Sequence, residues 1–333
     1  MRIAYLLEST ELCGGVLVAA LQAEELARRG HRVVVVTPRP AEQWFRLSLA
    51  HLEVSSFGEA RGLAEADVRV ATFWTTVAPA LEGARGPVFH LCQGYEADLS
   101  FYDRVRSHIE AAYAMPARKL AITSTLARAL VSKGFGPVTE VGQAFDGRPF
   151  FPGPERGGAP PVVVVVGPYL GHVKGVDVAL EGLRRWREAG GDFRLRRIAT
   201  LAPEAAERAS GLIDEYHHGL DPSQMPFAYR ASDLFLGANR REEGFGLPVL
   251  EALASGLPCL LSDTPTHREI AGDAAWYFPD GDPDGLAAAL PRVATREARA
   301  RARAEGPAVA ARFAPAKVAQ RLEKVFEEAL RGA

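Results

Sequence analysis

The sequence predicts two α/β domains, each built on a doubly wound parallel sheet covered by helices. Short aliphatic runs alternate with helix-length amphipathic segments along almost all of the 333 residues. The runs are continuously apolar, which is typical of strands buried on both faces of a parallel sheet. A chain of this length usually contains more than one domain. The proline- and glycine-rich stretch at residues 150–161 interrupts the alternation, and it predicts the boundary between the two domains.

The first domain is expected to span residues 1–150 and to contain six strands. Amphipathic segments at residues 16–29 and 126–133 carry apolar side chains at helical spacing, which predicts helices that cover the sheet. The expected strands are the aliphatic runs at residues 3–7, 32–36, 68–71, 88–91, 120–123 and 138–141.

The second domain, residues 160–312, repeats the alternation. Its expected strands lie at residues 162–166, 193–198, 234–236, 259–261 and 276–278, with helices at 175–189, 247–255 and 284–293. A last amphipathic helix at residues 315–330 is expected to return to the first domain. Open α/β sheets bind ligands beyond the carboxyl ends of their strands, so the cleft between two such domains is the expected site.

Composition excludes several classes of function. The 39 basic and 41 acidic residues give a net charge of −2, which leaves no bulk positive field for nucleic acid or an anionic bilayer. Three cysteines without a C-x-x-C pair do not fit a disulfide framework or a zinc site. No apolar run approaches the roughly 20 residues that span a bilayer. We therefore expect a soluble, cytoplasmic protein that contacts the inner face of a membrane at most peripherally.

Two groups of basic residues are interpreted as surface features. The arginines of residues 292–303 are expected to form one solvated helix face. In the first domain, six basic side chains outnumber the nearby acids and form a weak candidate patch for a lipid-linked acceptor. These are Arg104, Arg106, Arg118, Lys119, Arg128 and Lys133.

The most specific chemistry lies in the segment REEGFGLPVLEALASGLPCLLSD, residues 241–263. Glu243 precedes a predicted helix and Glu251 lies inside it, so the two carboxylates belong to different turns. Between them, Gly244 and Gly246 let the loop backbone approach a ligand and present N–H donors at the helix N-terminus. The pattern predicts a site for a pyrophosphate or a sugar hydroxyl, with Glu251 accepting hydrogen bonds from a ribose diol.

A glycine pair also follows the first expected strand. Gly14 and Gly15 open a predicted helix, and such a turn brings backbone N–H groups close to an anion. The G-x-G-x-x-G spacing is absent and no acidic residue ends the second strand, which disfavours a nicotinamide dehydrogenase. A tight strand-to-helix turn without a ligand explains the pair equally well.

Together these segments resemble the retaining glycosyltransferases of family four, which have the two-domain GT-B fold. The resemblance includes the N-terminal glycine pair, the segment KGVDVALEGL, and GQAFDGRPFFP, which is similar to the family's G-x-D-x-x-x-F-x-P with Asp146 at the aspartate. It is most specific in YRASDLFLGANRREEGFGLPVLEALASGLPCLLSD and continues in DAAWYFPDGDPDGLAAAL. The resemblance implies a nucleoside-diphosphate sugar as donor and a hydroxyl group as acceptor.

The resemblance also implies roles for single residues. Glu251 would bind the nucleotide ribose, and Lys174, in a Lys-Gly pair before a helix, would neutralise the diphosphate. Glu243 would act in catalysis and meet the donor. The other expected donor-binding residues are Gly15, Gly244, Phe245, Gly246 and Leu247.

The sequence departs from the family at two places. Members usually have an arginine after the glycine that ends the strand before Lys174, whereas this chain has Pro168. His172, Arg240 or Arg241 would supply the missing cation, and the sequence does not choose among them.

The second departure lies in the segment GPVFHLCQGYEADLS, residues 86–100. Many members place a histidine near the donor sugar at a position that holds Gln93 here, with His90 earlier in the strand. Gln93 forms hydrogen bonds but is no base, and QGYE resembles a subgroup around rhamnan-synthesis transferases. Gln93 is therefore the catalytic candidate of this segment, Tyr95 and Glu96 join Gly14 as sugar or acceptor candidates, and His90 is interpreted as a buried strand histidine.

The expected function is transfer of a hexose with retention of configuration, in the synthesis of bacterial surface glycans or glycoconjugates. No cofactor or metal is expected, because Lys174 and backbone N–H groups would carry the diphosphate charge. The acceptor is a glycan, a lipid-linked sugar or a small molecule. Two alternatives stay open: a GT-B-type sugar-nucleotide epimerase, and a non-catalytic protein that binds nucleotide sugars or acts as a scaffold.

Overall fold

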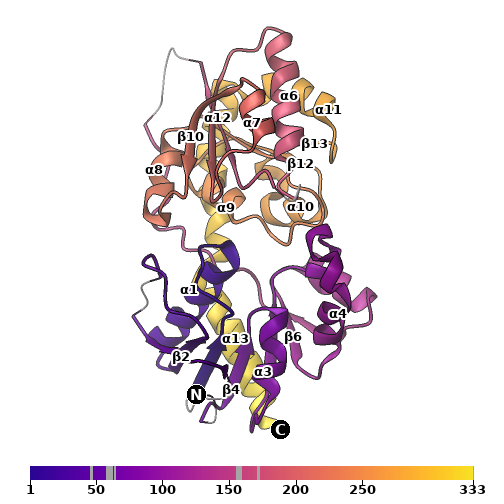
Figure 1. Ribbon diagram of the computed structural model, residues 1–333. Coiled ribbons are helices and arrows are strands. Elements are labelled where there is room, and N and C mark those ends of the chain that lie inside the picture. Colours follow the sequence, from indigo (N-terminus) through magenta and orange to yellow (C-terminus); the bar gives the residue numbers. More distant parts are fainter. Residues whose placement is uncertain (46–47, 58–62, 64, 155–159, 171–172, 333) are drawn as a thin grey trace. The chain divides into compact units, whose positions relative to one another are not determined.

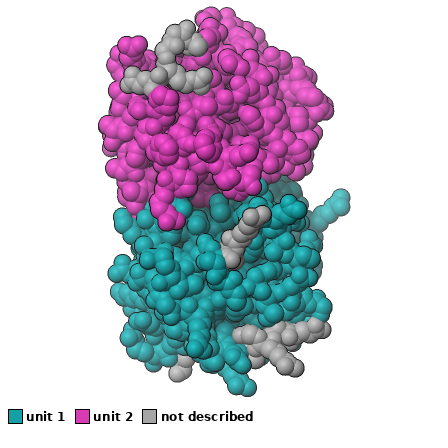
Figure 2. Space-filling model, turned by 90° about the vertical axis from the view of Figure 1, so that its left-hand side faces the viewer, with its two compact units in different colours: residues 1–146, 313–333 teal, residues 147–312 magenta. Residues whose placement is uncertain are grey.

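The computed structural model describes residues 1–45, 48–57, 63, 65–154, 160–170 and 173–332, whose helices and strands are drawn in Figure 1. The chain divides into two compact units, which Figure 2 shows in different colours. Unit 1 comprises residues 1–146 and 313–333, and unit 2 comprises residues 147–312. Each unit contains one parallel sheet with helices packed against it, which is the fold class that the sequence predicts.

The sheet of unit 1 has the strand order β3-β2-β1-β4-β5-β6-β7. Every neighbouring pair in it is parallel. The order reverses between β1 and β4, so these two strands flank the topological switch point of the sheet. The strands are β1 (Arg2–Leu6), β2 (Arg32–Thr37), β3 (Ala50–Glu53), β4 (Val68–Ala71), β5 (Val88–Cys92), β6 (Arg118–Ala121) and β7 (Val138–Glu140).

The last helix of the chain, α13 (Pro315–Arg331), belongs to unit 1 and packs against α1 (Gly14–Arg28). Phe326 of α13 is fully buried, and its ring centroid lies 4.8 Å from that of Phe89 in β5. On the rim of the same contact, Glu323 pairs with Arg29 at 2.5 Å and with His31 at 2.8 Å. The other helices of this unit are α3 (Val77–Leu81), α4 (Arg106–Ala114) and α5 (Ser124–Ser132), with 3-10 turns η2 (Trp74–Thr76), η3 (Glu96–Asp98) and η4 (Ser100–Val105).

The sheet of unit 2 has the order β10-β9-β8-β11-β12-β13, and it is also parallel throughout. Its switch point lies between β8 and β11, the counterparts of β1 and β4 in unit 1. The strands are β8 (Val162–Val166), β9 (Arg194–Ala199), β10 (Ile213–His218), β11 (Leu234–Gly237), β12 (Cys259–Ser262) and β13 (Trp276–Phe278).

A continuous apolar core joins this sheet to its helices. Val163 and Val165 point to the same layer because side chains alternate along a strand. Trp186 of α6 stacks on Phe193 with their centroids 5.1 Å apart. The helices are α6 (Val176–Glu188), α7 (Ala205–Ala209), α8 (Met225–Arg230), α9 (Leu247–Ala254), α10 (Pro265–Ala271), α11 (Pro283–Val293) and α12 (Arg296–Ala310), with 3-10 turns η5 (Pro222–Gln224), η6 (Gly272–Ala274) and η7 (Ala311–Phe313), the last of which leads into unit 1.

The aliphatic-run criterion misses two strands, β3 and β10. Both lie at the edge of a sheet, and most of their residues are partly or largely exposed. An edge strand needs no continuous apolar sequence, because only part of its surface is buried. Of the predicted linker at residues 150–161, residues 155–159 lie outside the described chain. Among the helices of the described ranges, none is long and apolar enough to cross a bilayer.

Candidate functional site

Two loops meet at the carboxyl edge of the unit 2 sheet, beside its switch point. One follows β8 and leads to α6, and the other follows β11 and leads to α9. The backbone N–H of Arg240 donates to the carbonyl of Val173 at 2.9 Å, which joins the two loops directly. This is the place where doubly wound sheets bind ligands.

Lys174 and Glu243 form an ion pair across these loops, with Nζ and Oε1 2.6 Å apart. Both side chains remain partly exposed, at 23% and 17%. Gly167 makes room for the side chain of Lys174, and Gly175 makes room for the backbone of Ala238. Gly167 has φ +123°, and a Cβ there would lie 2.7 Å from Lys174 Cγ; Gly175 has φ +57°, and its Cβ would lie 1.8 Å from the carbonyl oxygen of Ala238. The backbone path therefore requires the glycine of the Lys-Gly pair.

Glu251 lies behind this pair, on the buried face of α9. Its Oε2 accepts a hydrogen bond from the hydroxyl of Tyr229 at 2.7 Å. Burial raises the pKa of Glu251 to about 7, although the Tyr229 hydroxyl and the charge of Lys174 both favour the ionised form. The carboxyl is thus held in place by a partner that the sequence did not indicate, since Tyr229 lies 22 residues earlier.

The segment between the two glutamates leads into the N-terminus of α9. Gly246 adopts φ +89° at the N-cap, and no side chain caps the first turn of the helix. Phe245 and Gly246 are buried, whereas Gly244 and Leu247 are half-buried. Uncapped N–H groups at the positive end of a helix favour an anion. The structure therefore brings all the predicted donor-binding residues of unit 2 to one edge of one sheet.

The cation expected to replace the family's arginine has three candidates. Arg240 donates to Asp177 at 2.8 Å, and Arg241 is largely exposed and lies 3.4 Å from Asp280. His172 lies outside the described residues. Beneath Pro168, the fully buried Arg197 donates to the carbonyl of Gly167 at 2.8 Å and pairs with Glu207. Arg197 therefore supports the strand end, and its charge is already compensated.

Sequence reasoning missed one histidine near this edge. His267 of α10 follows β12, is 1% exposed, and has an Nε2 without a hydrogen-bond partner in the described part of the chain. Its Nδ1 lies 2.8 Å from the carbonyl oxygen of Ser262, which only accepts, so Nδ1 carries the proton and Nε2 holds a lone pair. Burial lowers the pKa of His267, and Glu243 and Lys174 both act on it electrostatically. The sequence signal that could have indicated His267 is its position shortly after β12, a buried parallel strand.

In unit 1, the structure brings Gly15 and Gln93 together. Gly14 and Gly15 begin α1 after Cys13, and Gln93 directly follows β5. The side-chain amide of Gln93 donates to the carbonyl of Gly15 at 3.0 Å, and a Cβ on Gly15 would lie 3.1 Å from the same nitrogen. Both residues thus lie at the carboxyl edge of this sheet.

Tyr95 and Glu96 are held by a cluster of aromatic rings. The buried Tyr95 packs on Tyr113 with centroids 4.9 Å apart, and Lys133 Nζ lies 4.7 Å from its ring centroid. The Tyr113 hydroxyl lies 2.7 Å from Oε2 of Glu96, and burial raises the pKa of Glu96. Tyr95 is a packing residue in this arrangement, whereas Glu96 is half-buried.

His90 lies inside β5 and is 1% exposed. Neither ring nitrogen has a hydrogen-bond partner among the described residues. Burial, followed by the nearby charge of Lys119, lowers the pKa of His90 to about 3, so the ring is neutral at physiological pH. Gln93, and not His90, lies at the strand end. No group of three or more His, Cys, Asp or Glu side chains within the described ranges is arranged to hold a metal ion.

Comparison with known proteins identifies a family for part of the chain. Residues 160–296, which include Lys174, Glu243 and Glu251, match the family model described as Glycosyl transferases group 1. The chain carries a group 1 glycosyltransferase domain. This domain lies entirely within unit 2.

Several curated proteins are similar in sequence. The phosphatidyl-myo-inositol mannosyltransferase of Mycobacterium leprae is 28% identical over 171 residues, which cover 50% of this chain and 46% of that protein. The serotype-specific mannosyltransferase WbdA of Escherichia coli is 32% identical over 146 residues, 40% of this chain and 17% of that protein. The phosphatidyl-myo-inositol mannosyltransferase of Mycolicibacterium smegmatis is 26% identical over 324 residues, which cover 85% of this chain and 81% of that protein. The chain thus spans less than half the length of the first two relatives.

Solved structures of glycosyltransferases superpose on the whole chain. Sucrose-phosphate synthase from Thermosynechococcus elongatus has a TM-score of 0.77 at 16% identity, and all of both chains is covered. Anabaena Alr3699/HepE in complex with UDP-glucose has a TM-score of 0.76 at 15% identity, with 98% of this chain and 100% of that chain covered. At such identities the likeness establishes the fold, which is GT-B.

Proposed function

We propose that this protein transfers a hexose from a nucleoside-diphosphate sugar to a hydroxyl acceptor, with retention of the anomeric configuration. The observation that carries the proposal is the Lys174–Glu243 pair at the switch point of unit 2, with the buried Glu251 behind it. These three residues lie in the group 1 glycosyltransferase domain.

Lys174 supplies the charge that a diphosphate needs. Its ammonium group has three N–H donors, one of which is directed to Glu243. The remaining donors and the uncapped start of α9 would meet the phosphate oxygens. Glu243 keeps Lys174 in position before the donor binds, and afterwards its carboxylate accepts from a hydroxyl of the donor sugar.

Glu251 would accept hydrogen bonds from the two hydroxyls of the ribose. Its carboxyl is oriented by Tyr229, so it needs no rearrangement to receive the diol. Binding two hydroxyl donors favours the ionised form, and we therefore expect donor binding to lower the pKa of Glu251.

The transfer step needs no protein nucleophile. The bond between C1 of the sugar and the phosphate oxygen breaks, and the acceptor oxygen bonds to C1 on the same face. The leaving phosphate takes the acceptor's proton, while Lys174 and the helix N-terminus stabilise the negative charge that develops on it. Gln93 has no basic group for this proton, which is consistent with assigning the proton to the phosphate.

We assign acceptor binding to unit 1, through Gly14, Gln93 and Glu96. The carboxyl edge of its sheet carries amide, carboxyl and backbone groups, which suit neutral hydroxyls. Because several relatives are named mannosyltransferases, mannose is the first donor sugar to test, and bacterial surface glycan synthesis is the expected setting.

The test is release of nucleoside diphosphate from a panel that includes GDP-mannose and UDP-glucose, with sugar and lipid-linked acceptors. We expect acceptor-dependent release with one donor, unchanged by EDTA, and a product whose anomeric configuration by NMR equals that of the donor. Tight donor binding without turnover would identify a non-catalytic binding protein. An isomerised donor in the absence of acceptor would identify an epimerase instead.

A further inference from the structure

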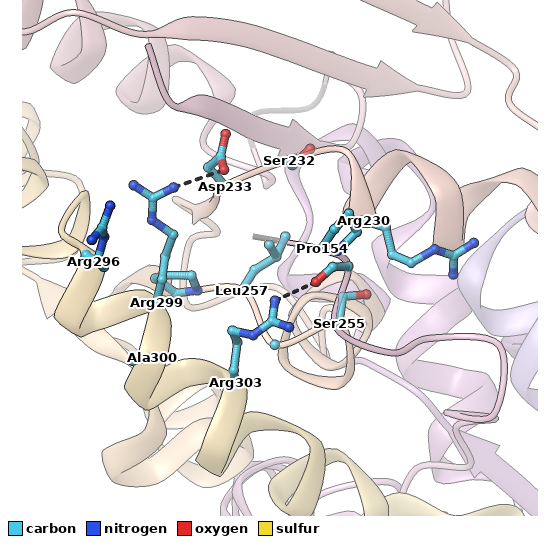
Figure 3. Close-up of a pocket in the computed structure, with 13 residues that line it drawn as sticks. Pro154, Arg230, Ser232, Asp233, Ser255, Leu257, Arg296, Arg299, Ala300 and Arg303 are labelled. Atoms are coloured by element: carbon cyan, nitrogen blue, oxygen red, sulfur yellow. Dashed lines mark hydrogen bonds and ion pairs between the residues drawn. The ribbon is translucent and has the colours of Figure 1, made fainter. Parts of the chain in front are cut away.

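A pocket lies in unit 2 away from the candidate donor site, and Figure 3 shows its lining. It has a volume of about 280 Å³ and lies between one face of α12 and the loops that precede β11 and β12. Arginines of α12 form one wall, and Asp233, Ser255 and Leu257 belong to the loops opposite. The proposed donor site does not use any of these residues.

The pocket and the candidate donor site lie at opposite edges of the same sheet. Asp233 directly precedes β11 and Pro258 directly precedes β12, so the pocket lies at the amino ends of these parallel strands. Glu243 and Gly246 come after β11, at the carboxyl ends. Helix α9 runs between the two places, from Gly246 at its N-cap to Ser255 at its C-cap.

The pocket carries an excess of positive charge. Four arginines and one aspartate line it, which leaves three positive charges in excess. Arg296, Arg299 and Arg303 follow one another at helical spacing and share one face of α12. A solvated helix face is expected here from the sequence; Arg296 is indeed exposed, whereas Arg299 and Arg303 are half-buried, because the face closes a pocket against loops that are distant in sequence.

The three arginines differ in whether their guanidinium groups have hydrogen-bond or ion-pair partners. Arg299 pairs with Asp233 at 3.1 Å, and Arg303 donates to the carbonyl of Gly153 at 2.6 Å; dashed lines mark both contacts in Figure 3. Arg296 is exposed and has no hydrogen-bond or ion-pair partner in the described ranges of the chain. Two guanidinium groups are therefore positioned by the protein, and a third remains available.

A buried hydroxyl on the opposite wall also lacks a partner. Ser255 is 1% exposed, and its Oγ has no hydrogen-bond partner in the part of the chain that the structure describes. Leaving such a group unpaired is unfavourable, but the burial of this oxygen keeps it out of reach of a molecule in the pocket. The case for an anionic ligand therefore rests on the arginines.

Helix ends do not change the sign of the local charge. The first turn of α12 begins at Arg296, and its positive end adds to the field of the arginines. The negative end of α9 lies at Ser255, but it is equivalent to only about half an elementary charge. The three excess guanidinium charges outweigh it.

We propose that this pocket binds a phosphate monoester of a small organic molecule. Arg296, Arg299 and Arg303 receive the phosphate, since guanidinium groups match phosphate oxygens in geometry and charge. Pro154, Leu257 and Ala300 line the same pocket and provide apolar surface for the organic part. The proposal does not depend on the reaction assigned to the carboxyl edge of the sheet.

The test measures binding of mannose 6-phosphate and of inorganic phosphate to the full chain by isothermal titration calorimetry. The decisive variant is Arg296→Ala, because this side chain has no hydrogen-bond or ion-pair partner among the residues that the structure describes. We expect it to weaken mannose 6-phosphate binding about tenfold, on the scale of one charge-assisted hydrogen bond. The matched control is Arg292→Ala in α11, which removes the same charge from an exposed position outside the pocket and is expected to change nothing.

Three further results decide the remaining questions. If Lys174→Met abolishes the binding and Arg296→Ala does not, the ester occupies the donor site and the proposal is wrong. Equal affinity for inorganic phosphate would overturn the role of the apolar wall. Flotation with phosphatidylcholine vesicles, with and without phosphatidic acid, tests the lipid source: binding to the acidic vesicles that Arg296→Ala abolishes, without binding of the free ester, would replace the small molecule by a lipid headgroup.

Discussion

Apart from the additional edge strand β7 in unit 1, the two sheets have the same strand order, yet the polar groups at their carboxyl edges are held in different ways. In unit 2, Lys174 and Glu243 pair across two loops and stay partly exposed, so both charges are accessible to a ligand. In unit 1, the amide of Gln93 is bonded to the Gly15 backbone, and Glu96 is bonded to Tyr113. The scaffold is the same, but one edge presents formal charges and the other presents groups that are neutral or already engaged.

This difference separates the two proposed tasks. A diphosphate requires a cation at a defined position, and a single lysine on a glycine-bounded loop provides it. A sugar hydroxyl requires hydrogen-bond partners of either kind, and an amide and a carboxyl are sufficient. The balanced net charge of the chain therefore agrees with a site that depends on a few local groups. Four predictions test this comparison.

The largest effect is expected in the stability of unit 1, whose core includes α13 from the end of the chain. Phe326→Ala should lower the free energy of unfolding by about 3–5 kcal/mol, because it removes a large side chain that is fully buried against Phe89. Urea denaturation followed by tryptophan fluorescence measures the change. The control Glu327→Ala alters an exposed position on the same helix; a loss below about 1 kcal/mol for Phe326→Ala would show that α13 is not needed by unit 1.

The next largest effect is expected in kcat, and it compares a charge in unit 2 with a hydrogen bond in unit 1. Lys174→Met should lower kcat about 100- to 1,000-fold, because it removes the cation that stabilises the leaving diphosphate. Gln93→Ala should lower it only about tenfold, on the scale of one lost hydrogen bond. Steady-state kinetics of nucleoside-diphosphate release give both values. Equal losses in the two variants would contradict the division of tasks between the units.

Affinity for the donor gives a third test. Glu251→Ala should weaken donor binding about 10- to 100-fold, since it removes a charged acceptor from two hydroxyl donors. Glu96→Gln should leave donor binding unchanged and raise the KM of the acceptor. Calorimetric titration of the donor and acceptor-dependent kinetics distinguish the two results. Unchanged donor affinity in Glu251→Ala would make the ribose assignment wrong.

The smallest effect is a pH dependence of stability. The pKa of Glu251 is about 7 in the fold, against an ordinary value of 4.5, so between these pH values the folded state binds more protons than the unfolded state. The free energy of unfolding should therefore fall by about 2 kcal/mol as the pH rises from 5 to 8. Glu251→Gln cannot ionise and should remove that part of the slope. Denaturation at both pH values, without donor, tests this; the same slope in both proteins would mean that Glu251 ionises normally.

Sequence patterns were informative where one local property decides the structure. The strand β8 was recognised because burial on both faces requires a continuous apolar run, here of valines. The Glu243–Glu251 segment was recognised because a helix start that lets the backbone approach a ligand requires glycines. The strands β3 and β10 were missed, because an edge position depends on neighbours rather than on local composition. Tyr229 and His267 were missed for a similar reason: each matters through a partner that only the folded chain brings near.

The sequence by itself determined two parallel α/β domains and the motif at the carboxyl edge of the second sheet, because periodicity, glycine placement and length act locally. Only the tertiary structure decided that Lys174 meets Glu243, 69 residues away, and that Tyr229 orients Glu251. It also turned the arginine face of α12 into the wall of a pocket. Distances between residues far apart in sequence are set by how strands and helices pack, and no local pattern contains that information.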